Sequence, residues 1–340
     1  MPHSPMWQRF AAQLLTDRSG RSVGEVVGRI LAVQAQDRRG ARLAVRARSR
    51  GLTAADVDRA LTDERSVVVG DLNRGTQHLV LAEDYWWLHA LTTPQLRTGI
   101  GRRLTEEGVT PSAAARAQRL IAREVSDGPR TRSQLRGALD AAGIATSPQG
   151  LYHLLRLSCA QGTAVRGPTH DGEQAFVDAR SWLGEPPRLD RGQALARLAE
   201  RYLAGHGPAT DRDLARWAGI PLRDARAGLA AIADRTVATA AGAVLPRGTP
   251  PATSAPAPVL LGAFEPVLLG WTSREEVLGR HSEDVVSGGV FRAFALVAGR
   301  AAGRWRIERG RARLAPFDAW DEDVTLALEQ DAADVERFLA

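Results

Sequence analysis

The sequence predicts an α+β fold that is mainly helical, with three tandem winged-helix (helix-turn-helix) domains and a small C-terminal β-barrel. Three observations lead to this prediction. A threonine-capped helix motif occurs three times, at intervals of 78 and 79 residues; helical and strand-like segments accompany each copy; and short strand-like runs follow a Pro- and Ala-rich stretch at 247–257. With 340 residues, 44% of them hydrophobic, the chain is long enough to form several cores.

The repeated motif has the features of a helix start. In each copy a threonine is followed three residues later by Asp or Gln, so the hydroxyl can cap free backbone amides while the second side chain reaches back to the threonine N–H. The next residue is apolar and begins the buried face of the helix. The three copies are Thr53-Ala54-Ala55-Asp56-Val57, Thr131-Arg132-Ser133-Gln134-Leu135 and Thr210-Asp211-Arg212-Asp213-Leu214.

The segments around the second copy follow the order helix, short helix, helix, hairpin. Helical patterns cover about 112–125 and 148–160, and strand patterns at 163–166 and 174–177 flank a turn at His170-Asp171-Gly172. A helix-turn-helix with an appended hairpin is a winged helix, which is typical of DNA-binding domains.

The first and third copies repeat this order. The first has its predicted hairpin at 67–69 and 78–81, with extra helices before it; the third has helices at 192–203 and 221–232 and a hairpin at 236–238 and 243–245. The predicted winged-helix domains are therefore 1–100, 101–186 and 187–246.

The region after the linker at 247–257 has a different pattern. Strand-like runs at 259–261, 267–271, 291–297 and 303–307, separated by glycine turns, predict a small barrel. The acidic tail after Pro316 predicts a final helix. The barrel and this helix form the fourth predicted domain, 258–340.

The basic residues are all arginine and are unevenly distributed. The chain has 45 Lys+Arg against 39 Asp+Glu, a net charge of +6, and it contains no lysine. Arginine-rich stretches at 29–50, 97–166 and 300–313 fit a face that binds a polyanion. Solvated helix faces are the alternative interpretation for any single stretch.

Several protein classes are excluded by features that the chain lacks. No apolar run approaches the roughly 20 residues of a membrane span, and the first residues lack the pattern of a secretory signal. The single cysteine, Cys159, excludes an internal disulfide and a Cys-rich zinc site, and the seven histidines show no HxxxH or HExxH spacing. We expect a soluble cytoplasmic protein without metal, cofactor or membrane contact, in which Cys159 is buried and inert.

Four stretches carry a resemblance to a known family: 29–36, which contains Gln34-Ala35-Gln36; 73–80; 201–210 together with Arg216-Trp217; and 260–271. Their order along the chain resembles that of the bacterial winged-helix DNA glycosylases of the AlkZ/YcaQ type. The resemblance implies a C-shaped cradle of three winged helices and a barrel around double-stranded DNA, and it implies a monomer.

The Gln-x-Gln pattern resembles the AlkZ-like branch, because the YcaQ-like branch has Asp at the second position. The resemblance implies that Gln34 and Gln36 are catalytic. It also implies removal of bulky N7-alkylated purines, as self-resistance in producers of DNA-alkylating natural products. Glu265 departs from the family pattern, which has Asp there, and we expect this change to affect the scaffold more than the chemistry.

The chemistry of such a lesion suits a glutamine pair. A purine alkylated at N7 already carries a positive charge and departs without protonation, so the enzyme only has to hold a water near C1′ and stabilise an oxocarbenium-like sugar. A glutamine carbonyl can do both. At positions i and i+2 of a helix, however, the two amides would point about 200° apart. They converge only if the helix ends there or the segment is extended; otherwise they are two solvated glutamines on an amphipathic helix.

DNA contacts are expected from the basic segment after the glutamines, from the first predicted hairpin and from the second winged helix. Arg74 and Thr76 have a surface β-turn as the alternative interpretation, and His78 a structural role. Trp86 and Trp87 are expected in the core rather than as a platform for bases. The predicted DNA-binding residues are Arg38, Arg39, Arg74, Thr76, His78, Arg132, Gln149 and Arg156.

Two functions from different classes remain open at this point. One is a monofunctional DNA glycosylase; the other is a non-enzymatic DNA binder, either a transcription regulator or a lesion sensor. Three fused copies favour the glycosylase, since regulators usually repeat their DNA contacts by forming dimers. A nuclease is disfavoured because no cluster of acidic residues is evident for two metal ions.

If the chain is a glycosylase, we predict that it has no β-lyase activity. With no lysine present, only the N-terminal amine could attack C1′ and form an imine. The product should be an intact abasic site, seen on a denaturing gel as strand breakage only after alkali or heat. A borohydride-trapped protein–DNA adduct, or nicks without such treatment, would contradict this prediction.

Overall fold

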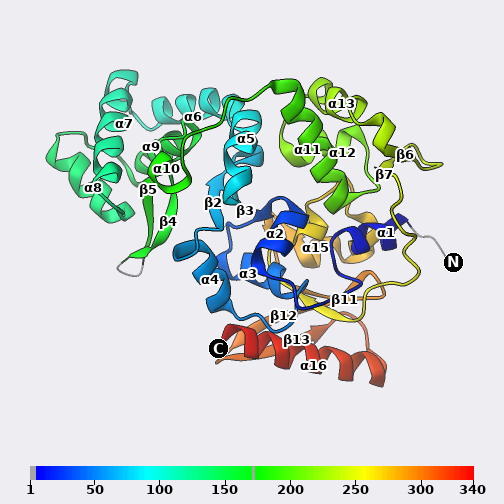
Figure 1. Cartoon of the computed structure of the whole chain (residues 1–340). Helices are drawn as coiled ribbons and strands as arrows, with labels where there is room; N and C mark the ends of the chain where they lie inside the picture. The colour runs from blue at the N-terminus through cyan, green and yellow to red at the C-terminus, as the bar shows by residue number, and fades with distance from the viewer. Residues whose placement is uncertain (1–4, 171–172) are drawn as a thin grey trace. The chain divides into compact units, whose positions relative to one another are not determined.

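The computed structural model describes residues 5–170 and 173–340, and helices make up about half of this part of the chain (Figure 1). Asp171 and Gly172 of the predicted turn at 170–172 lie outside the described residues. The contacts divide the chain into two compact units, one formed by 1–58 with 191–340 and the other by 59–190. Within the described ranges, none of the helices has the length and apolar character that crossing a membrane requires.

The 59–190 unit combines helices with an antiparallel sheet. Within the unit the strand order is β3-β2-β4-β5, and the predicted hairpins at 67–81 and 164–178 are confirmed, with Val67 opposite Leu81 and Val165 opposite Val177. The core includes Ile121, Leu135 and Leu154. The elements are β2 (Val67–Asp71), η1 (Asn73–Gly75), β3 (Gln77–Leu81), α5 (Ala82–Thr92), α6 (Pro94–Glu106), α7 (Pro111–Ser126), α8 (Arg132–Ala141), α9 (Pro148–Ala160), β4 (Ala164–His170), β5 (Glu173–Asp178) and α10 (Ala179–Leu183).

The other unit is built from the two ends of the chain. Helix α11 packs against α13 and α2, and the predicted hairpin at 236–246 is confirmed. Its helices are α1 (Pro5–Ala12), α2 (Val23–Ile30), α3 (Arg38–Arg46), α11 (Arg191–His206), α12 (Asp211–Ala218), α13 (Leu222–Ala230), α14 (Glu275–Leu278), α15 (Ser282–Val285) and α16 (Glu322–Leu339). Its strands are β1 (Val33–Gln34), β6 (Thr236–Ala238), β7 (Val244–Pro246), β8 (Val259–Leu261), β9 (Val286–Ser287), β10 (Val290–Phe291), β11 (Phe294–Val297), β12 (Arg300–Glu308) and β13 (Arg311–Pro316). Helix α4 (Ala54–Thr62) contains the boundary between the units.

The three threonine-capped helix starts are confirmed at α4, α8 and α12. Thr131 shows the geometry. Its hydroxyl accepts from the Gln134 backbone N–H at 3.2 Å, and the side-chain carbonyl of Gln134 accepts from the Thr131 backbone N–H at 2.8 Å. Thr53 and Thr210 make the same reciprocal bonds with an aspartate. The apolar residues after the motifs, Val57, Leu135 and Leu214, are all buried.

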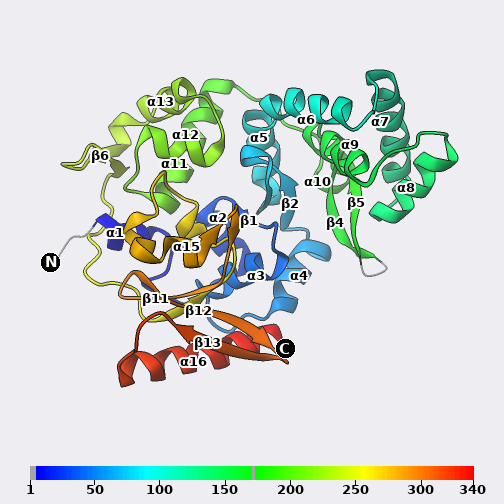
Figure 2. The same cartoon turned by 180° about the vertical axis from the view of Figure 1, so that it is seen from behind.

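The predicted C-terminal barrel is wrong. Residues 258–340 instead contain an open four-stranded antiparallel sheet in the order β13-β12-β11-β8 and a separate β9–β10 hairpin. Closing a barrel requires enough tilted strands for the two edges to meet, and β8 has only three residues. The predicted final helix, α16, is confirmed and lies along this sheet, as both views show (Figures 1 and 2). Its Glu336 accepts from the Ala312 N–H on edge strand β13 at 2.8 Å.

A buried arginine on α3 forms ion pairs with α16. The Arg46 guanidinium is 1% exposed; it forms ion pairs with Asp331 and Asp334 and donates to the Leu260 carbonyl at 3.2 Å. Asp331 also accepts from the Leu260 N–H at 2.7 Å, and Arg18 donates to Asp331 at 2.7 Å. Because removing charges from water is costly unless each is paired and hydrogen-bonded, this network specifies how α3, β8 and α16 meet.

A second buried arginine anchors the residues just after α3. Arg48 is fully buried and pairs with the equally buried Glu265. It also donates to the side-chain carbonyl of Gln13 at 2.8 Å. Glu265 is the residue that departs from the family pattern, and its carboxylate is used here as a structural partner for Arg48. The expected scaffold role of this position agrees with its location.

The first turn of α3 packs tightly against the backbone after β8. A Cβ on Gly40 would lie 2.3 Å from the Ala263 carbonyl oxygen, and a Cβ on Gly262 would lie 3.1 Å from the Gly40 Cα. At Gly40 only glycine permits such close approach, whereas a Cβ on Gly262 would make a tight contact. Together with Arg46 and Arg48, this contact fixes where α3 begins, immediately after Gln36.

We predict that Glu265→Gln strongly destabilises the protein, because it leaves the Arg48 charge buried and unpaired. The free energy of unfolding should fall by about 3 kcal/mol or more. Urea denaturation is the measurement. The control is Glu106→Gln, which removes a carboxylate from the exposed pair with Arg103 and should change stability by at most about 1 kcal/mol. Equal effects of the two substitutions would contradict the anchoring role of Arg48 and Glu265.

Candidate active site

Gln34 and Gln36 lie on a short non-helical segment between two helices: Gln34 ends strand β1, and Gln36 lies in the bend before α3. Helix α2 ends at its C-cap Leu31, whose φ is 68°; the backbone is extended at Val33–Gln34; and α3 begins at Arg38 with Asp37 as its N-cap. The two glutamines therefore do not share a helix, on which side chains two residues apart would diverge. The sequence allowed the two amides to converge if the helix ended before them, and α2 does end before Gln34.

The two amides are in direct contact. The Gln34 Nε2 donates to the Gln36 Oε1 at 2.5 Å. Gln34 is 6% exposed, whereas Gln36 is exposed. The pair thus has one amide held in the protein and one at the surface, and their bond leaves the Gln34 carbonyl oxygen and the Gln36 amide N–H groups available to a water or a sugar.

The residues after the glutamines form the start of α3. The Asp37 carboxylate accepts from the Gly40 N–H at 2.5 Å, so it is used to cap the helix. Arg38 and Arg39 occupy the first turn and are exposed. Their guanidinium groups provide positive charge within a few residues of both amides, which fits the predicted contact with DNA phosphates.

The predicted residues of the first hairpin meet at its turn. Arg74 and Gly75, with φ of 56° and 74°, form the turn between β2 and β3, and the Thr76 hydroxyl donates to the Asn73 carbonyl at 3.2 Å. Arg156 reaches this turn from α9 and donates to the Gly75 carbonyl at 2.7 Å. The structure therefore brings Arg74, Thr76 and Arg156 together, with Arg156 also bracing the turn.

His78 lies beneath this turn and is 2% exposed. Burial, followed by the positive charge of Arg74, lowers the pKa of His78 to about 3. Its Nδ1–H donates to the Thr76 carbonyl at 2.9 Å. His78 is therefore neutral at physiological pH and supports the backbone of the turn, in line with the structural alternative.

Arg132 and Gln149 form another group, at the starts of α8 and α9. Both are exposed, and Arg132 donates to the Pro148 carbonyl at 2.7 Å, next to Gln149. Of the two tryptophans expected in the core, Trp87 is buried, whereas Trp86 is partly exposed and donates to the Gly184 carbonyl at 2.9 Å. Cys159 is buried as expected, and burial raises the pKa of its thiol.

The sequence patterns did not predict the anchoring role of Arg46 and Arg48. Both belong to the arginine-rich stretch 29–50 that was interpreted as part of a polyanion-binding face, and for these two residues that interpretation is wrong, since both are buried. Within the described residues, no group of three His, Cys, Asp or Glu side chains could hold a metal ion.

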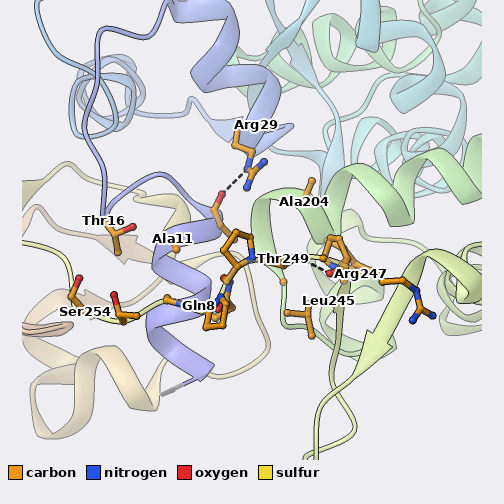
Figure 3. A pocket seen from close by; sticks show the side chains of 18 residues that line it. Gln8, Ala11, Thr16, Arg29, Ala204, Leu245, Arg247, Thr249 and Ser254 are labelled. Carbon is orange, nitrogen blue, oxygen red and sulfur yellow. Dashed lines mark hydrogen bonds between the residues drawn. The ribbon is translucent and has the colours of Figure 1, made fainter. Parts of the chain in front are cut away.

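A cavity of about 550 Å³ opens beside α1, the end of α11 and residues 245–254 (Figure 3). The Gln8 side chain joins α1 to this segment: it donates to the Pro250 carbonyl at 3.0 Å and accepts from the Ala252 N–H at 2.9 Å. Arg29 lines the wall and donates to the Ala12 carbonyl at 3.0 Å. None of the lining residues is a predicted site residue, so this cavity is distinct from the glutamine pair.

Comparisons with known proteins point to one family. A family model described as "DNA glycosylase AlkZ-like" matches residues 27–338. A curated relative from Streptomyces sahachiroi, described as an interstrand DNA cross-link repair glycosylase, is 27% identical over 357 aligned residues, which cover 97% of this chain and 94% of the relative. The solved structure of the Streptomyces sahachiroi DNA glycosylase AlkZ has the same fold, with a TM-score of 0.81, 24% identity and coverage of 99% of this chain and 97% of that one.

We predict that the neutral His78 makes stability depend on pH. Because the folded pKa of His78 is about 3, below that of an unfolded histidine, the unfolded state takes up the proton and stability is lost as the pH falls below about 6.5. At pH 5 the loss is about 2 kcal/mol per such histidine. Urea denaturation at pH 7.5 and pH 5 should show a decline about 2 kcal/mol smaller for His78→Gln than for the wild type. Equal declines would contradict a neutral, buried His78.

Proposed function

The chain belongs to the AlkZ-like DNA glycosylase family, and from that premise we propose that it is a monofunctional DNA glycosylase that hydrolyses the N-glycosidic bond of bulky N7-alkylated purines, including crosslinked purines. The observation that carries the proposal is the direct contact between the Gln34 and Gln36 amides on the short segment between α2 and α3. The printed function of the Streptomyces relative, repair of interstrand crosslinks, supports this substrate class.

The proposed step needs no proton donor. Water attacks C1′, the bond from C1′ to the purine nitrogen breaks, and its electron pair neutralises the cationic purine as it departs. The Gln34 carbonyl accepts a hydrogen bond from the attacking water and turns its dipole toward the oxocarbenium-like sugar. The proton released by the water passes to bulk solvent, since an amide does not titrate in this range.

The carboxylates beside this segment are occupied by structural roles, which supports a mechanism that depends on amides. Asp37 caps α3, and Glu265 is buried against Arg48. We assign hydrolysis to Gln34 and Gln36, and backbone contacts to Arg38, Arg39, Arg74, Thr76, Arg132, Gln149 and Arg156, with His78 supporting the hairpin turn.

The proposed partner is double-stranded DNA carrying an alkylated purine, bound by one copy of the chain in the cytoplasm. The biological role that fits this substrate is repair of natural-product adducts and self-resistance to the agent that makes them. A DNA binder without enzymatic activity would bind the same duplex and release no base, so excision assays separate the two functions.

We predict that Gln34→Ala and Gln36→Ala each lower the single-turnover rate of N7-alkylguanine excision by about 10²–10³, the usual loss when one preorganised polar group is removed from a site. DNA affinity should change little, because both side chains are uncharged. The wild-type rate should stay flat from about pH 6 to 8, unlike that of a carboxylate-dependent hydrolase.

The matched control is Gln161→Ala, which removes an exposed glutamine at the end of α9 and should leave excision unchanged. If both site variants excise at the wild-type rate, the glutamines are not catalytic. If excision falls only in proportion to binding, they are DNA contacts. A wild-type protein that binds alkylated duplex but releases no base would favour the regulator or sensor.

A further inference from the structure

The C-terminal sheet carries a groove whose charged lining side chains are all arginines. Arg304 and Arg306 alternate along β12 and are both exposed, and Arg306 stands directly opposite Arg313 on β13. Arg292 lies just before β11. The groove has a volume of about 430 Å³ and is lined by Arg292, Ala293, Arg304, Trp305, Arg306, Arg313, Leu314 and Ala315. We call this the arginine groove.

We propose that the arginine groove binds the phosphodiester backbone of double-stranded DNA, at a place separate from the glutamine pair and irrespective of base sequence. This inference rests on the proposed function, because it takes DNA as the substrate. It gives a role to the arginine-rich stretch at 300–313, which contains none of the predicted site residues.

The four arginines of the groove have only one carboxylate, that of Glu308, within ion-pair distance among the described residues. Arg306 pairs with Glu308 at 2.6 Å, and Arg313 lies 4.0 Å from the same carboxylate. Among the described residues, the guanidinium groups of Arg292 and Arg304 have no ion-pair partner. Like charges directly opposite each other on an antiparallel pair destabilise a sheet, so this arrangement favours an anion that comes from outside the chain.

The remaining lining residues favour phosphates over bases. The groove contains no Asn, Gln, Ser, Thr, Asp or Glu, so it lacks the carboxamides, hydroxyls and carboxylates that commonly read adenine and cytosine edges. Guanidinium forks match phosphate oxygens well. Trp305 is only 6% exposed, and its Nε1–H donates to the Leu261 carbonyl at 2.8 Å. It offers no free ring face for stacking on single-stranded bases, which leaves the duplex backbone as the matching ligand.

The groove connects to the glutamine segment through short contacts inside one unit. Arg292 follows Phe291, whose ring centroid lies 5.3 Å from that of Phe264. Phe264 follows Ala263, whose carbonyl abuts Gly40 in the first turn of α3. Backbone contacts at the groove would therefore hold the duplex on the same compact unit that carries Gln34 and Gln36, and binding energy far from the reacting bond helps to orient it.

The test compares the wild type with Arg304→Gln/Arg313→Gln in binding to undamaged duplexes of two sequences, titrated with salt. Each lost phosphate contact should reduce the slope of log K against log salt by about 0.9, so the double variant should lose about 1.8, equally for both sequences.

The control variant is Arg311→Gln/Arg337→Gln, which removes the same charge from residues that pair with Glu336 and Asp334 of α16 and do not line the groove. Its slope should match the wild type. A groove variant with the wild-type slope, or a control with the same loss, overturns the inference and leaves the glycosylase proposal intact. A wild type that shows no salt-dependent DNA binding overturns the proposed function itself. Weakened binding to single strands but not to duplex would assign the groove to a different nucleic acid and also overturn the inference.

Discussion

Two buried guanidinium groups determine how helix α3 is held against α16 and the residues after β8. Arg46 and Arg48, at and just after the end of α3, are buried and need carboxylates to remain there. Their partners come from distant parts of the chain: Asp331 and Asp334 on α16, and Glu265 after β8. Since α3 is held at one end by these ion pairs and at the other by the contact of Gly40 with Ala263, the segment before it has little freedom. The anchoring of α3 therefore constrains the positions of Gln34 and Gln36, which directly precede it.

The chemistry that suits such a site depends on position rather than on proton transfer. A leaving group that is already cationic removes the need for a general acid, and amides then provide what is left, a placed water and a dipole facing the sugar. The same chain places its ionisable groups in structural roles: Asp37 caps a helix, Glu265 neutralises Arg48, and His78 stays neutral under a hairpin turn. The candidate site itself is small: a buried Gln34 whose amide donates to an exposed Gln36.

Local sequence patterns predict many of the helices and hairpins, but less of how distant segments pack together. The threonine caps at α4, α8 and α12, the three hairpins and α16 follow from neighbouring residues, because caps and turns are local interactions. The strand pattern predicts a C-terminal barrel where the structure has an open sheet, because closure depends on how the strand edges meet and not on the strand pattern. The buried state of Arg46 and Arg48 was missed because their acidic partners lie more than 200 residues away. The resemblance alone identifies Gln34 and Gln36; their spacing states only the condition, a helix end or an extended segment, under which the two amides can act together.

The measurement that tests this account most directly is a double-mutant cycle on Gln34 and Gln36, using single-turnover excision of an N7-alkylguanine from duplex DNA. If the two amides hold one water between them, removing the second after the first costs little more. The account predicts that Gln34→Ala/Gln36→Ala is about as slow as the slower single variant. Fold-losses that multiply in the double variant would show that the two side chains act independently, and would contradict a shared site built by the anchoring of α3.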